Sequence, residues 1–255
     1  MSVASGACGA AKGLRTVILA GGKGVRLQPF TANFPKPLVP LGDIPIIEIL
    51  IRRLIAFGLT DVTLTLGHLA ALIKAYFHHR RELSSRLKLT FVEEDEPSGT
   101  AGSLALVTDL TKTFFVMNGD LLTDLNFDNL VWFHREERAI LTIAAHRRTL
   151  KIDLGVLEIG NDHRVTGYIE KPEIQHDVSM GVYVYEPSVL RFIEPGKFLN
   201  FPDLVLKLLR AGEKVCAWPY DGLWLDIGRP DDYARAQKLF DEQPRAFLAE
   251  TPEAL

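Results

Sequence analysis

The sequence TVILAGGKGVRLQPFTANFPKPLVPL, residues 16–41, determines how the rest of the chain is interpreted. It opens with the apolar run 16–20, which is typical of a buried β-strand. A glycine-rich turn follows at 21–24, where backbone N–H groups can approach an anion without side chains in the way. Arg26 and Lys36 come next, on a loop stiffened by three prolines. A strand, a glycine loop and two spaced cations predict a binding site for a polyphosphate.

Length, composition and charge narrow the class of protein. The chain has 255 residues, of which 47% are hydrophobic and 24% charged, with a formal net charge of −3. These values are typical of a globular protein with a substantial core, and the charge argues against a general nucleic-acid binder, whose surface would be basic. No apolar run is long enough to span a membrane, and two cysteines do not make a disulfide framework. We therefore expect a cytoplasmic protein without nucleic-acid or membrane partners.

Outward from the first strand, strand and helix patterns alternate along the chain. Apolar runs at 61–66, 87–92 and 114–117 are typical of buried strands, and helical patterns lie between them. Such alternation favours an α/β fold, a three-layer α/β/α sandwich around a mostly parallel, Rossmann-like sheet. From residue 139 the pattern changes to short strands separated by turns, which predicts a small antiparallel extension.

Two aspartates follow short apolar runs further along the chain. Asp120 ends Asn118-Gly119-Asp120, directly after a predicted strand, and ligands of open α/β sheets bind beyond the carboxyl ends of strands. Asp226 lies in WLDIGRP, residues 224–230. Either aspartate alone is equally well explained as a turn or helix-cap residue. Together with the glycine loop they predict a Mg²⁺ site, since Mg²⁺ binds one or two carboxylates plus water and phosphate oxygens.

The opening stretch also matches the pattern of a known family. The pattern G-G-x-G-x-R-L-x-P-x-T-x-x-x-P-K-P is present at Gly21, Gly22, Gly24, Arg26, Leu27, Pro29, Thr31, Pro35, Lys36 and Pro37. It resembles the signature of the sugar-1-phosphate nucleotidylyltransferases, also called NDP-sugar pyrophosphorylases. Val25 stands where that family usually has threonine, so a hydroxyl that could bind phosphate or base is missing.

The resemblance implies a set of site residues. N-G-D and W-L-D-x-G are similar to the family's metal motifs, and Glu170-Lys171-Pro172 is similar to its E-K-P segment. The implied catalytic residues are Arg26, Lys36, Asp120, Lys171 and Asp226, with Mg²⁺ on Asp120 and Asp226. The implied nucleotide contacts are Leu19, Ala20, Gly21, Gly22, Gly24, Val25, Gly99, Thr100 and Gly119. The implied contacts to the sugar phosphate are Gly155, Glu170, Lys171, Ser179 and Gly181, although Ser179-Met180-Gly181 departs from the family's usual Asn-Ala-Gly.

The segment Gly99-Thr100-Ala101-Gly102 bears on the choice of base. It resembles the G-T-A-G of mannose-1-phosphate and heptose-1-phosphate guanylyltransferases, and glycines there would let the backbone approach a base closely. A related uridylyltransferase acting on muramic acid phosphate has the same segment, so GTP is favoured without other triphosphates being excluded. A helix N-terminus that needs small residues is a compatible explanation.

The implied reaction is transfer of a nucleoside monophosphate from an NTP, with GTP favoured, to a sugar 1-phosphate, giving an NDP-sugar and pyrophosphate. The alternatives are a thymidylyl-, uridylyl- or cytidylyltransferase of the same family, a nucleotide-sugar-binding regulatory protein without turnover, and a glycosyltransferase, which would leave the Arg26 and Lys36 loop unexplained. We expect one domain over 14–243, with 139–200 as a sugar-side subdomain, between a disordered tail at 1–13 and a loose tail at 244–255. Homodimers and homotetramers, common in the family, are the expected assemblies, and no C-terminal β-helix module is expected.

Overall fold

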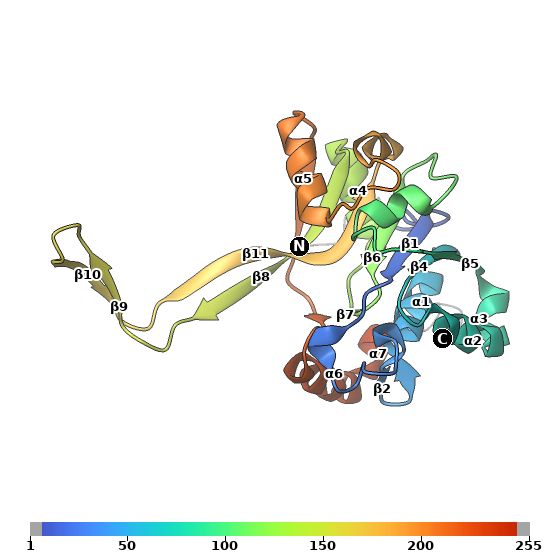
Figure 1. The fold of residues 1–255 in the computed structure, drawn as a ribbon, viewed down its shortest axis with the longest axis horizontal. Coiled ribbons are helices and arrows are strands. Elements are labelled where there is room, and N and C mark those ends of the chain that lie inside the picture. Colours follow the sequence, from blue (N-terminus) through green and yellow to red (C-terminus); the bar gives the residue numbers. More distant parts are fainter. Residues whose placement is uncertain (1–6, 249–255) are drawn as a thin grey trace.

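A seven-stranded mixed β-sheet forms the centre of the computed structural model, which describes residues 7–248 (Figure 1). The strand order is β12-β8-β11-β6-β1-β4-β5. The bounds are β1 (Arg15–Ala20), β4 (Asp61–Leu66), β5 (Lys88–Glu93), β6 (Phe114–Asn118), β8 (Leu141–Lys151), β11 (Glu173–Tyr185) and β12 (Val215–Tyr220). β11 runs antiparallel to both of its neighbours, whereas the other strand pairs of this sheet are parallel. The predicted α/β fold with a mostly parallel sheet is confirmed.

Helices cover both faces of the sheet. The central strands need this cover because their apolar side chains point alternately to the two faces. Val17 and Ile18 of β1 are both fully buried, and they belong to different hydrophobic clusters. The helices that contribute residues to the cluster around Ile18 include α1 (Ile46–Ala56), α2 (Ala70–His79), α4 (Phe127–Glu137), α6 (Pro230–Glu242) and α7 (Pro244–Phe247). The cluster around Val17 is covered by α5 (Phe201–Arg210) and the short 3-10 helices η3 (Gly102–Leu106) and η4 (Pro187–Phe192). A further short helix, α3 (Arg81–Arg86), follows α2. None of the helices in the described part of the chain combines the length and apolar character needed to cross a membrane.

The sheet brings two predicted site segments to one edge. β1 and β6 are parallel neighbours, with Leu19 opposite Asn118, so the glycine loop after β1 and the Asp120 turn after β6 emerge side by side. Two short strands then place Asp226, since β13 (Trp224–Asp226) pairs antiparallel with β7 (Leu121–Thr123). In that pairing Asp226 lies opposite Leu121, the residue after Asp120. A further short pair, β2 (Pro40–Leu41) and β3 (Ile44–Pro45), precedes α1.

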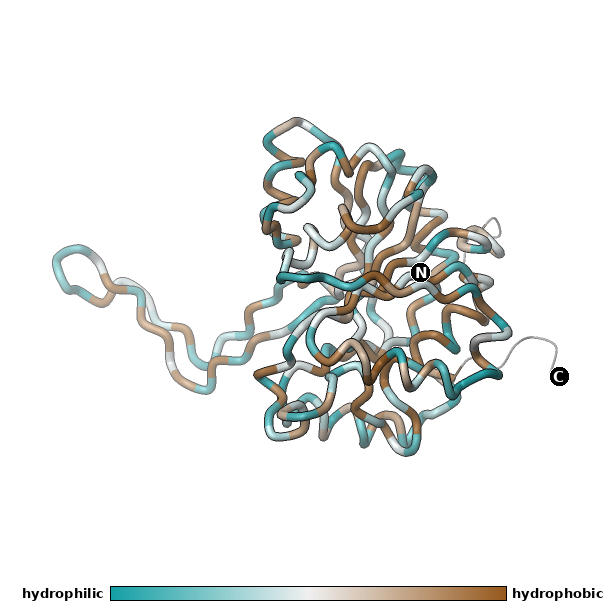
Figure 2. Tube along the Cα trace, turned by 45° about the vertical axis from the view of Figure 1, so that its right-hand side comes forward, coloured by the Kyte–Doolittle hydropathy of each residue, from teal (hydrophilic) through white to brown (hydrophobic). Residues whose placement is uncertain are grey.

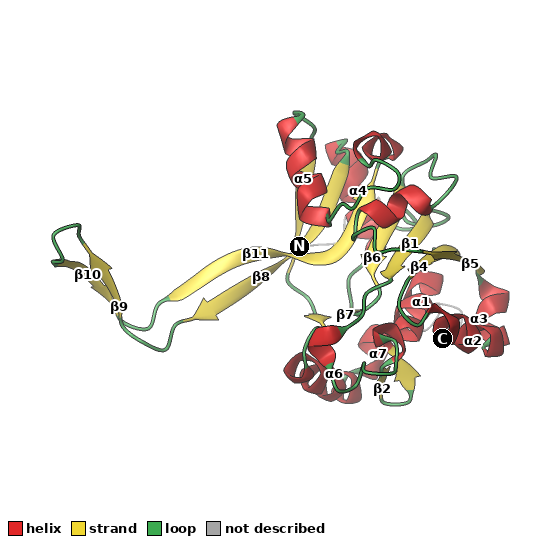
Figure 3. Cartoon of the chain, viewed as in Figure 1, coloured by secondary structure: helices red, strands yellow, loops and turns green. Residues whose placement is uncertain are grey.

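The predicted sugar-side subdomain at 139–200 has a different extent in the structure. The first half of β8 and the second half of β11 belong to the central sheet and have largely buried side chains. The outer halves of these strands continue as a two-stranded ribbon that projects far from the body, with β9 (Val156–Ile159) and β10 (Val165–Ile169) at its tip (Figures 1 and 3). We call this projection, residues 147–178, the arm. Figure 2 shows apolar and polar residues interspersed along it, outside the hydrophobic core.

Both predicted tails are ordered where the structure describes them. The backbone N–H groups of Gly9 and Ala11 donate to the two carboxylate oxygens of Asp128, at 2.9 and 2.8 Å, and Ala11 is fully buried. At the other end Phe247 of α7 is fully buried and lies near Phe240. The tail predictions for 7–13 and 244–248 are therefore wrong, because hydrogen bonds and apolar contacts from distant segments hold both. Residues 1–6 and 249–255 lie outside the described residues.

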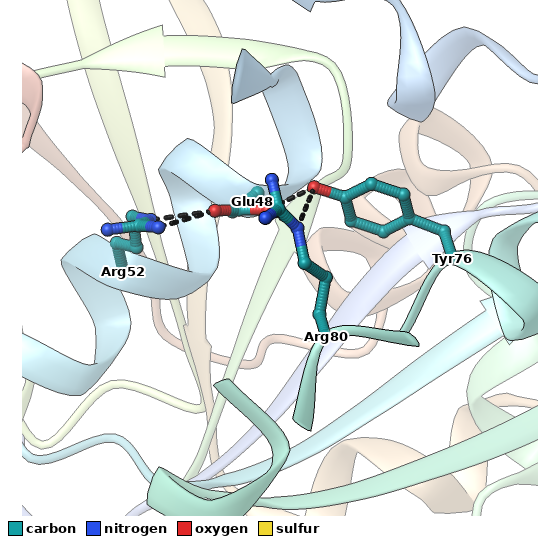
Figure 4. Close-up of polar contacts among 4 residues, drawn as sticks. All are labelled: Glu48, Arg52, Tyr76 and Arg80. Atoms are coloured by element: carbon teal, nitrogen blue, oxygen red, sulfur yellow. Dashed lines mark hydrogen bonds and ion pairs between the residues drawn. The ribbon is translucent and has the colours of Figure 1, made fainter. Parts of the chain in front are cut away.

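A buried carboxylate links α1 to α2 on one face of the sheet (Figure 4). Glu48 is fully buried, and its Oε1 accepts hydrogen bonds from Arg52 Nε and Nη2 at 2.9 and 2.7 Å. Its Oε2 accepts from the hydroxyl of Tyr76 and lies 3.1 Å from Arg80 Nε. Burial and the hydrogen bond to Glu48 raise the pKa of Tyr76. The carboxylate is thus compensated by two cations and a hydroxyl, as a buried charge requires.

Replacing Glu48 by alanine is expected to lower the free energy of unfolding by about 2–4 kcal/mol, because a buried network loses its central acceptor. The loss should stay within that range because Arg52 and Arg80 are partly exposed and can be hydrated. Urea unfolding followed by circular dichroism measures the difference. Glu82→Ala on the neighbouring helix, where the residue is exposed, is the control. Equal unfolding midpoints for the two variants would contradict this account.

His134 on α4 is a second buried polar group. Its Nδ1 lies 2.8 Å from Thr142 Oγ1 of β8, and its Nε2 lies 3.1 Å from Glu186 Oε1. Burial lowers the pKa of His134, and the hydrogen bond to Glu186 offsets part of this effect. The folded protein therefore holds the ring neutral at pH values where the unfolded chain takes up a proton.

This pKa shift predicts a pH-dependent stability. The contribution of His134 to the free energy of unfolding is fully present above the pKa of the unfolded chain, near 6.5. It is lost as the pH falls from there toward the lower pKa of the folded state. The slope from one proton is at most about 1.4 kcal/mol per pH unit. Urea unfolding of the wild type and His134→Gln between about pH 7.5 and 5.5 tests it, with the variant expected to show the shallower dependence. Parallel curves would show that other groups cause the dependence.

Candidate active site

The glycine loop begins directly after β1, and its shape depends on Gly24. Gly24 has φ of +63°, and a Cβ there would lie 3.1 Å from side-chain atoms of both Thr31 and Lys36. Thr31 Oγ1 donates a hydrogen bond to the Gly24 carbonyl oxygen at 2.7 Å. A glycine is required because the chain turns through a left-handed conformation while residues 31–36 fold back against it. The loop thereby exposes Arg26 and holds Lys36 in a nearly buried position.

Lys36 and Asp120 form an ion pair at the edge of the sheet. The other oxygen of Asp120, Oδ1, is buried and has no hydrogen-bond partner. The Ile227 N–H donates to the Asp120 carbonyl at 3.0 Å, which fixes the segment carrying Asp226 beside it. Buried polar atoms normally have hydrogen-bond partners, so this unpaired oxygen is available to a ligand.

Asp226 faces the same region from β13. Burial is the main cause that raises the pKa of Asp226, and the neighbouring Asp120 raises it further. Lys36 and Arg26 act in the opposite direction. A Cβ on Gly228 would lie 3.7 Å from both Asp226 Oδ2 and Arg26 Nη2, so the carboxylate and the guanidinium flank that glycine. The two carboxylates lie close enough to repel each other, and one of them has an unpaired oxygen. Such a pair is suited to a divalent cation. No cluster of three or more His, Cys, Asp or Glu that could hold a metal occurs within residues 7–248, so water or a ligand would complete the coordination.

Three adjoining cavities surround these carboxylates. The glycine-loop cavity, of about 450 Å³, contains the glycine loop, Arg26, Lys36 and Asp120 in its wall. The polar cavity, of about 270 Å³, is lined by the polar groups of Thr100, Asn118, Ser179, Tyr183 and Asp226, together with apolar side chains such as Leu19, Met180, Phe201 and Trp224. The arginine cavity, of about 520 Å³, is lined by five arginines together with His146, Trp224, Asp226 and Asp232. Asp226 and Trp224 belong to the last two cavities, and Arg26 and Gly228 belong to the first and third.

Most of the predicted nucleotide contacts meet in one place. The glycine-loop cavity is lined by Leu19, Gly21, Gly22, Gly24, Val25, Gly99 and Thr100. Ala20 is buried behind this wall, and a Cβ on Gly119 would lie 3.1 Å from the Leu19 carbonyl oxygen, so Gly119 allows the two strand ends to approach. Ser179 and Gly181 line the polar cavity instead. Residues of β1 and β11 and of the loops that follow β1, β5 and β6 therefore lie close together, although their roles in binding stay predictions.

Gly155, Glu170 and Lys171 lie on the arm, and they are not among the lining residues of the three cavities. Tyr168 Oη donates to Glu170 Oε2 at 2.7 Å, and a Cβ on Gly155 would lie 2.1 Å from that hydroxyl. Lys171 has φ of +45° at the turn after β10. Gly155 and Glu170 therefore lie together at the arm tip. That Gly155, Glu170 and Lys171 contact a sugar phosphate stays a prediction.

The segment predicted to face the base has a structural role as well. The Phe201 N–H at the start of α5 donates to Thr100 Oγ1 at 2.8 Å, so the Thr100 hydroxyl is already engaged. Ala101 and Gly102 both donate from their N–H groups to the Leu199 carbonyl oxygen, at 3.0 and 2.9 Å. Gly99 has φ of +82°, and a Cβ there would lie 2.5 Å from the same oxygen. Gly99 is therefore required for the loop to pack against residues 199–201.

Gly99→Ala is expected to lower the free energy of unfolding by at least about 1–3 kcal/mol, because the new methyl group meets a backbone oxygen and φ is positive. Nucleotide affinity should fall with it, since the Leu199 segment forms part of the same wall. Thermal unfolding with and without nucleotide measures both effects. Gly22→Ala is the control for stability, because a Cβ there has no heavy atom within 4 Å. An unchanged melting temperature for Gly99→Ala would contradict the packing argument.

Four residues of the site were not identified from the sequence. Glu94 lines the glycine-loop cavity and accepts hydrogen bonds from Ser98 N and Oγ, each at 2.9 Å. Tyr183 lines the polar cavity, and burial raises its pKa to about 12. Asn118 and Trp224 lie in predicted motifs but were given no role. Glu94 directly follows β5, whose carboxyl end lies at the same sheet edge. This position after a predicted strand is the sequence feature that could identify Glu94 as a site residue.

The comparisons with known proteins agree with this geometry. Residues 15–243 match the family model described as nucleotidyl transferase. This chain belongs to that family. Two curated relatives of this chain are a mannose-1-phosphate guanylyltransferase catalytic subunit beta from Drosophila pseudoobscura pseudoobscura, 32% identical, and a UTP–glucose-1-phosphate uridylyltransferase from Synechocystis, 31% identical. The alignments cover 89% and 88% of this chain but 62% of each relative, so the chain spans about three fifths of their length.

Solved structures support the fold. A Bacillus anthracis chain crystallised with sucrose superposes with a TM-score of 0.70 at 24% identity, covering 88% of the present chain and 94% of the Bacillus chain. HddC from Yersinia pseudotuberculosis superposes with a TM-score of 0.67 at 25% identity, covering 89% of the present chain and 99% of HddC.

Proposed function

We propose that this nucleotidyl transferase transfers a nucleoside monophosphate from a nucleoside triphosphate to a sugar 1-phosphate, releasing an NDP-sugar and pyrophosphate. The observation that carries the proposal is the meeting of Lys36, Asp120 and Asp226 between the glycine-loop cavity and the polar cavity. The glycine-loop cavity suits a nucleoside triphosphate, and the polar cavity suits a sugar. The carboxylates lie where the triphosphate and the sugar 1-phosphate would react.

The nucleotide half of the site is built from backbone and cations. Residues 21–24 can direct N–H groups at phosphate oxygens, and Arg26 supplies a guanidinium that suits bidentate contact with a phosphate. Lys36, which packs against Gly24, adds a second cation to the same cavity. Because phosphoryl chemistry spreads negative charge over several oxygens, fixed cations lower the barrier chiefly by electrostatic stabilisation.

Asp120 and Asp226 would hold Mg²⁺, the divalent ion whose oxygen preference fits two carboxylates completed by water and phosphate. When bound, Mg²⁺ neutralises charge on the phosphates and aligns them for in-line displacement. Lys36 pairs with Asp120 in the free protein, and it would turn toward the triphosphate when a cation takes its place. The unpaired Oδ1 of Asp120 supports this assignment.

The acceptor half lies around the polar cavity. Asn118, Ser179 and Tyr183 present an amide and two hydroxyl groups, which can form hydrogen bonds with sugar hydroxyls. An oxygen of the acceptor phosphate attacks the α-phosphorus, the new P–O bond forms, and the bond to the β-phosphate oxygen breaks as pyrophosphate leaves. Positioning accounts for most of the rate enhancement, because no covalent intermediate is needed.

GTP is the favoured triphosphate, supported by the 99–102 segment and by the guanylyltransferases among the relatives. UTP is the second candidate, because a relative of similar identity is a uridylyltransferase. A non-catalytic nucleotide-sugar-binding protein is disfavoured by the intact pair of carboxylates.

Pyrophosphate release tests the proposal. Purified protein is incubated with Mg²⁺ and every pairing of four NTPs with a panel of sugar 1-phosphates. Strong release in the GTP series is expected, and the acceptor that supports it identifies the sugar. Release in the UTP series alone would reassign the base. No release from any pairing, with NDP-sugar binding still detected by calorimetry, would replace the proposal by the regulatory alternative.

A further inference from the structure

The arm joins the sheet at His146, the residue of β8 directly before the arm. His146 is half-buried, whereas residues 147–151 after it are exposed. Its Nε2 lies 3.2 Å from the Gly222 carbonyl oxygen, and because a carbonyl oxygen only accepts, Nε2 carries the proton and donates. The His146 ring lies 5.4 Å from that of Trp224, with the two planes inclined by 33°. Both contacts reach the segment that leads to Asp226.

Trp224 is attached to the other strand of the arm as well. Its Nε1 donates to the carbonyl oxygen of Met180 at 3.0 Å, and Met180 lies on β11 just after the arm ends. Trp224 and Asp226 are two residues apart in β13, so their side chains leave the strand on the same face. They accordingly line the same two cavities, the polar cavity and the arginine cavity. A displaced Trp224 is therefore expected to displace Asp226.

Further contacts of β13 come from the body of the protein. Its backbone pairs with β7, and the Ile227 N–H that follows donates to the Asp120 carbonyl oxygen at 3.0 Å. The Leu223 N–H donates to Asp124 Oδ1 at 2.8 Å. These bonds hold the backbone of the strand at the sheet edge without the help of His146. Removing the His146 side chain should therefore loosen the arm side of β13 while the strand itself stays paired.

We propose that His146 is a positioning residue, which acts through Trp224 to fix Asp226 relative to the arm. This inference rests on the proposed function, in which Asp226 binds Mg²⁺, together with the predicted contact between the arm and the acceptor phosphate. In-line attack requires the acceptor and the metal carboxylate to keep a fixed relation, and a misplacement of about 1 Å can cost roughly 10²-fold in rate. The arm is anchored to the body at its base, so contacts there set its direction relative to β13.

Magnesium titration of the free protein tests the position of Asp226 without turnover. Calorimetry with Mg²⁺ alone is expected to show an affinity about threefold or more weaker in His146→Ala than in the wild type. His146→Gln keeps an N–H donor at similar reach, so its affinity should lie closer to that of the wild type. His176→Ala, at an exposed histidine of β11 on the arm, is the control and should bind Mg²⁺ as the wild type does. Circular dichroism confirms that each variant is folded. Equal affinities for His146→Ala and the wild type would overturn the proposal.

Steady-state kinetics separates positioning from binding. With the substrate pairing that releases most pyrophosphate, His146→Ala should lower kcat about tenfold or more while both KM values change less than about twofold. The two KM values should hold because the arm and the glycine-loop cavity, which His146 does not line, keep their own contacts. A rise in the acceptor KM at unchanged kcat would make His146 a binding residue and overturn the proposal. If His146→Ala weakens Mg²⁺ binding but the wild type turns over no pairing of substrates, the positioning role stands and the proposed reaction fails.

Discussion

Asp120→Ala and Asp226→Ala are each expected to reduce Mg²⁺-dependent pyrophosphate release by roughly 10³-fold or more. Each substitution removes one of the two carboxylates that lie between the glycine-loop and polar cavities. Single-turnover kinetics at saturating substrates measures the effect on chemistry directly. Asp241→Ala, at an exposed position of α6, is the matched control. More than about a tenth of wild-type turnover in either site variant would contradict the assigned roles.

Substitutions at the same two aspartates should have opposite effects on the stability of the free protein. Burial and the proximity of Asp120 raise the pKa of Asp226, so its ionised form is less favourable in the folded state than in the unfolded chain. Asp226→Asn should therefore raise the melting temperature at neutral pH. Asp120→Ala should lower it, because Lys36 is nearly buried and would lose its partner. Two shifts of the same sign would contradict this description of the site.

Lys36→Met is the second substitution with a large expected effect, a fall of roughly 10²–10³-fold in kcat/KM for the triphosphate. The side chain is the nearly buried cation closest to Asp120, and methionine keeps its length without the charge. Lys36→Arg should recover little activity, because a larger planar guanidinium does not reproduce the position of a nearly buried ammonium group beside Asp120. Initial-rate kinetics across triphosphate concentrations gives the comparison.

Metal titration gives Lys36→Met a second readout. If Lys36 competes with a divalent cation for Asp120, its removal should tighten Mg²⁺ binding to the free protein even as turnover falls. Calorimetric titration with Mg²⁺ checks this, and Lys112→Ala, at an exposed lysine before β6, is the control. Weaker Mg²⁺ binding in the methionine variant would show that Lys36 supports the metal site instead of competing for it.

The segments whose local structure the sequence predicted correctly are contiguous. An apolar strand followed directly by glycines and Arg26 defines one short segment, and the structure forms it as β1, the glycine loop and the 3-10 helix η1 (Val25–Leu27). Asn118-Gly119-Asp120 likewise follows its strand without a gap. The side-chain pattern of a buried strand is local, and a residue just after that strand must lie at the sheet edge. The α/β class followed from the same alternation of patterns.

Pairings between distant segments were decided by the tertiary structure. Asp226 reaches Asp120 because β13 pairs with β7, and Thr100 is engaged because α5 begins beside it. Nothing local indicates these partners, since a short strand can pair with any edge that offers complementary hydrogen bonds and burial. The ordered ends at 7–13 and 244–248 have the same origin, in contacts with Asp128 and Phe240.

The arm shows the division most clearly. The order of motifs groups its residues with the sugar site, whereas in the structure β8 and β11 continue past the sheet and Lys171 does not line any of the three cavities. The same extension places Arg147 and Arg148 beside Arg229 and Arg235. The sequence by itself therefore determined the fold class, the glycine loop and the individual candidate residues, because these depend on neighbours along the chain. Only the tertiary structure decided which of those side chains share a cavity, because that depends on strand pairing and burial between segments far apart in sequence.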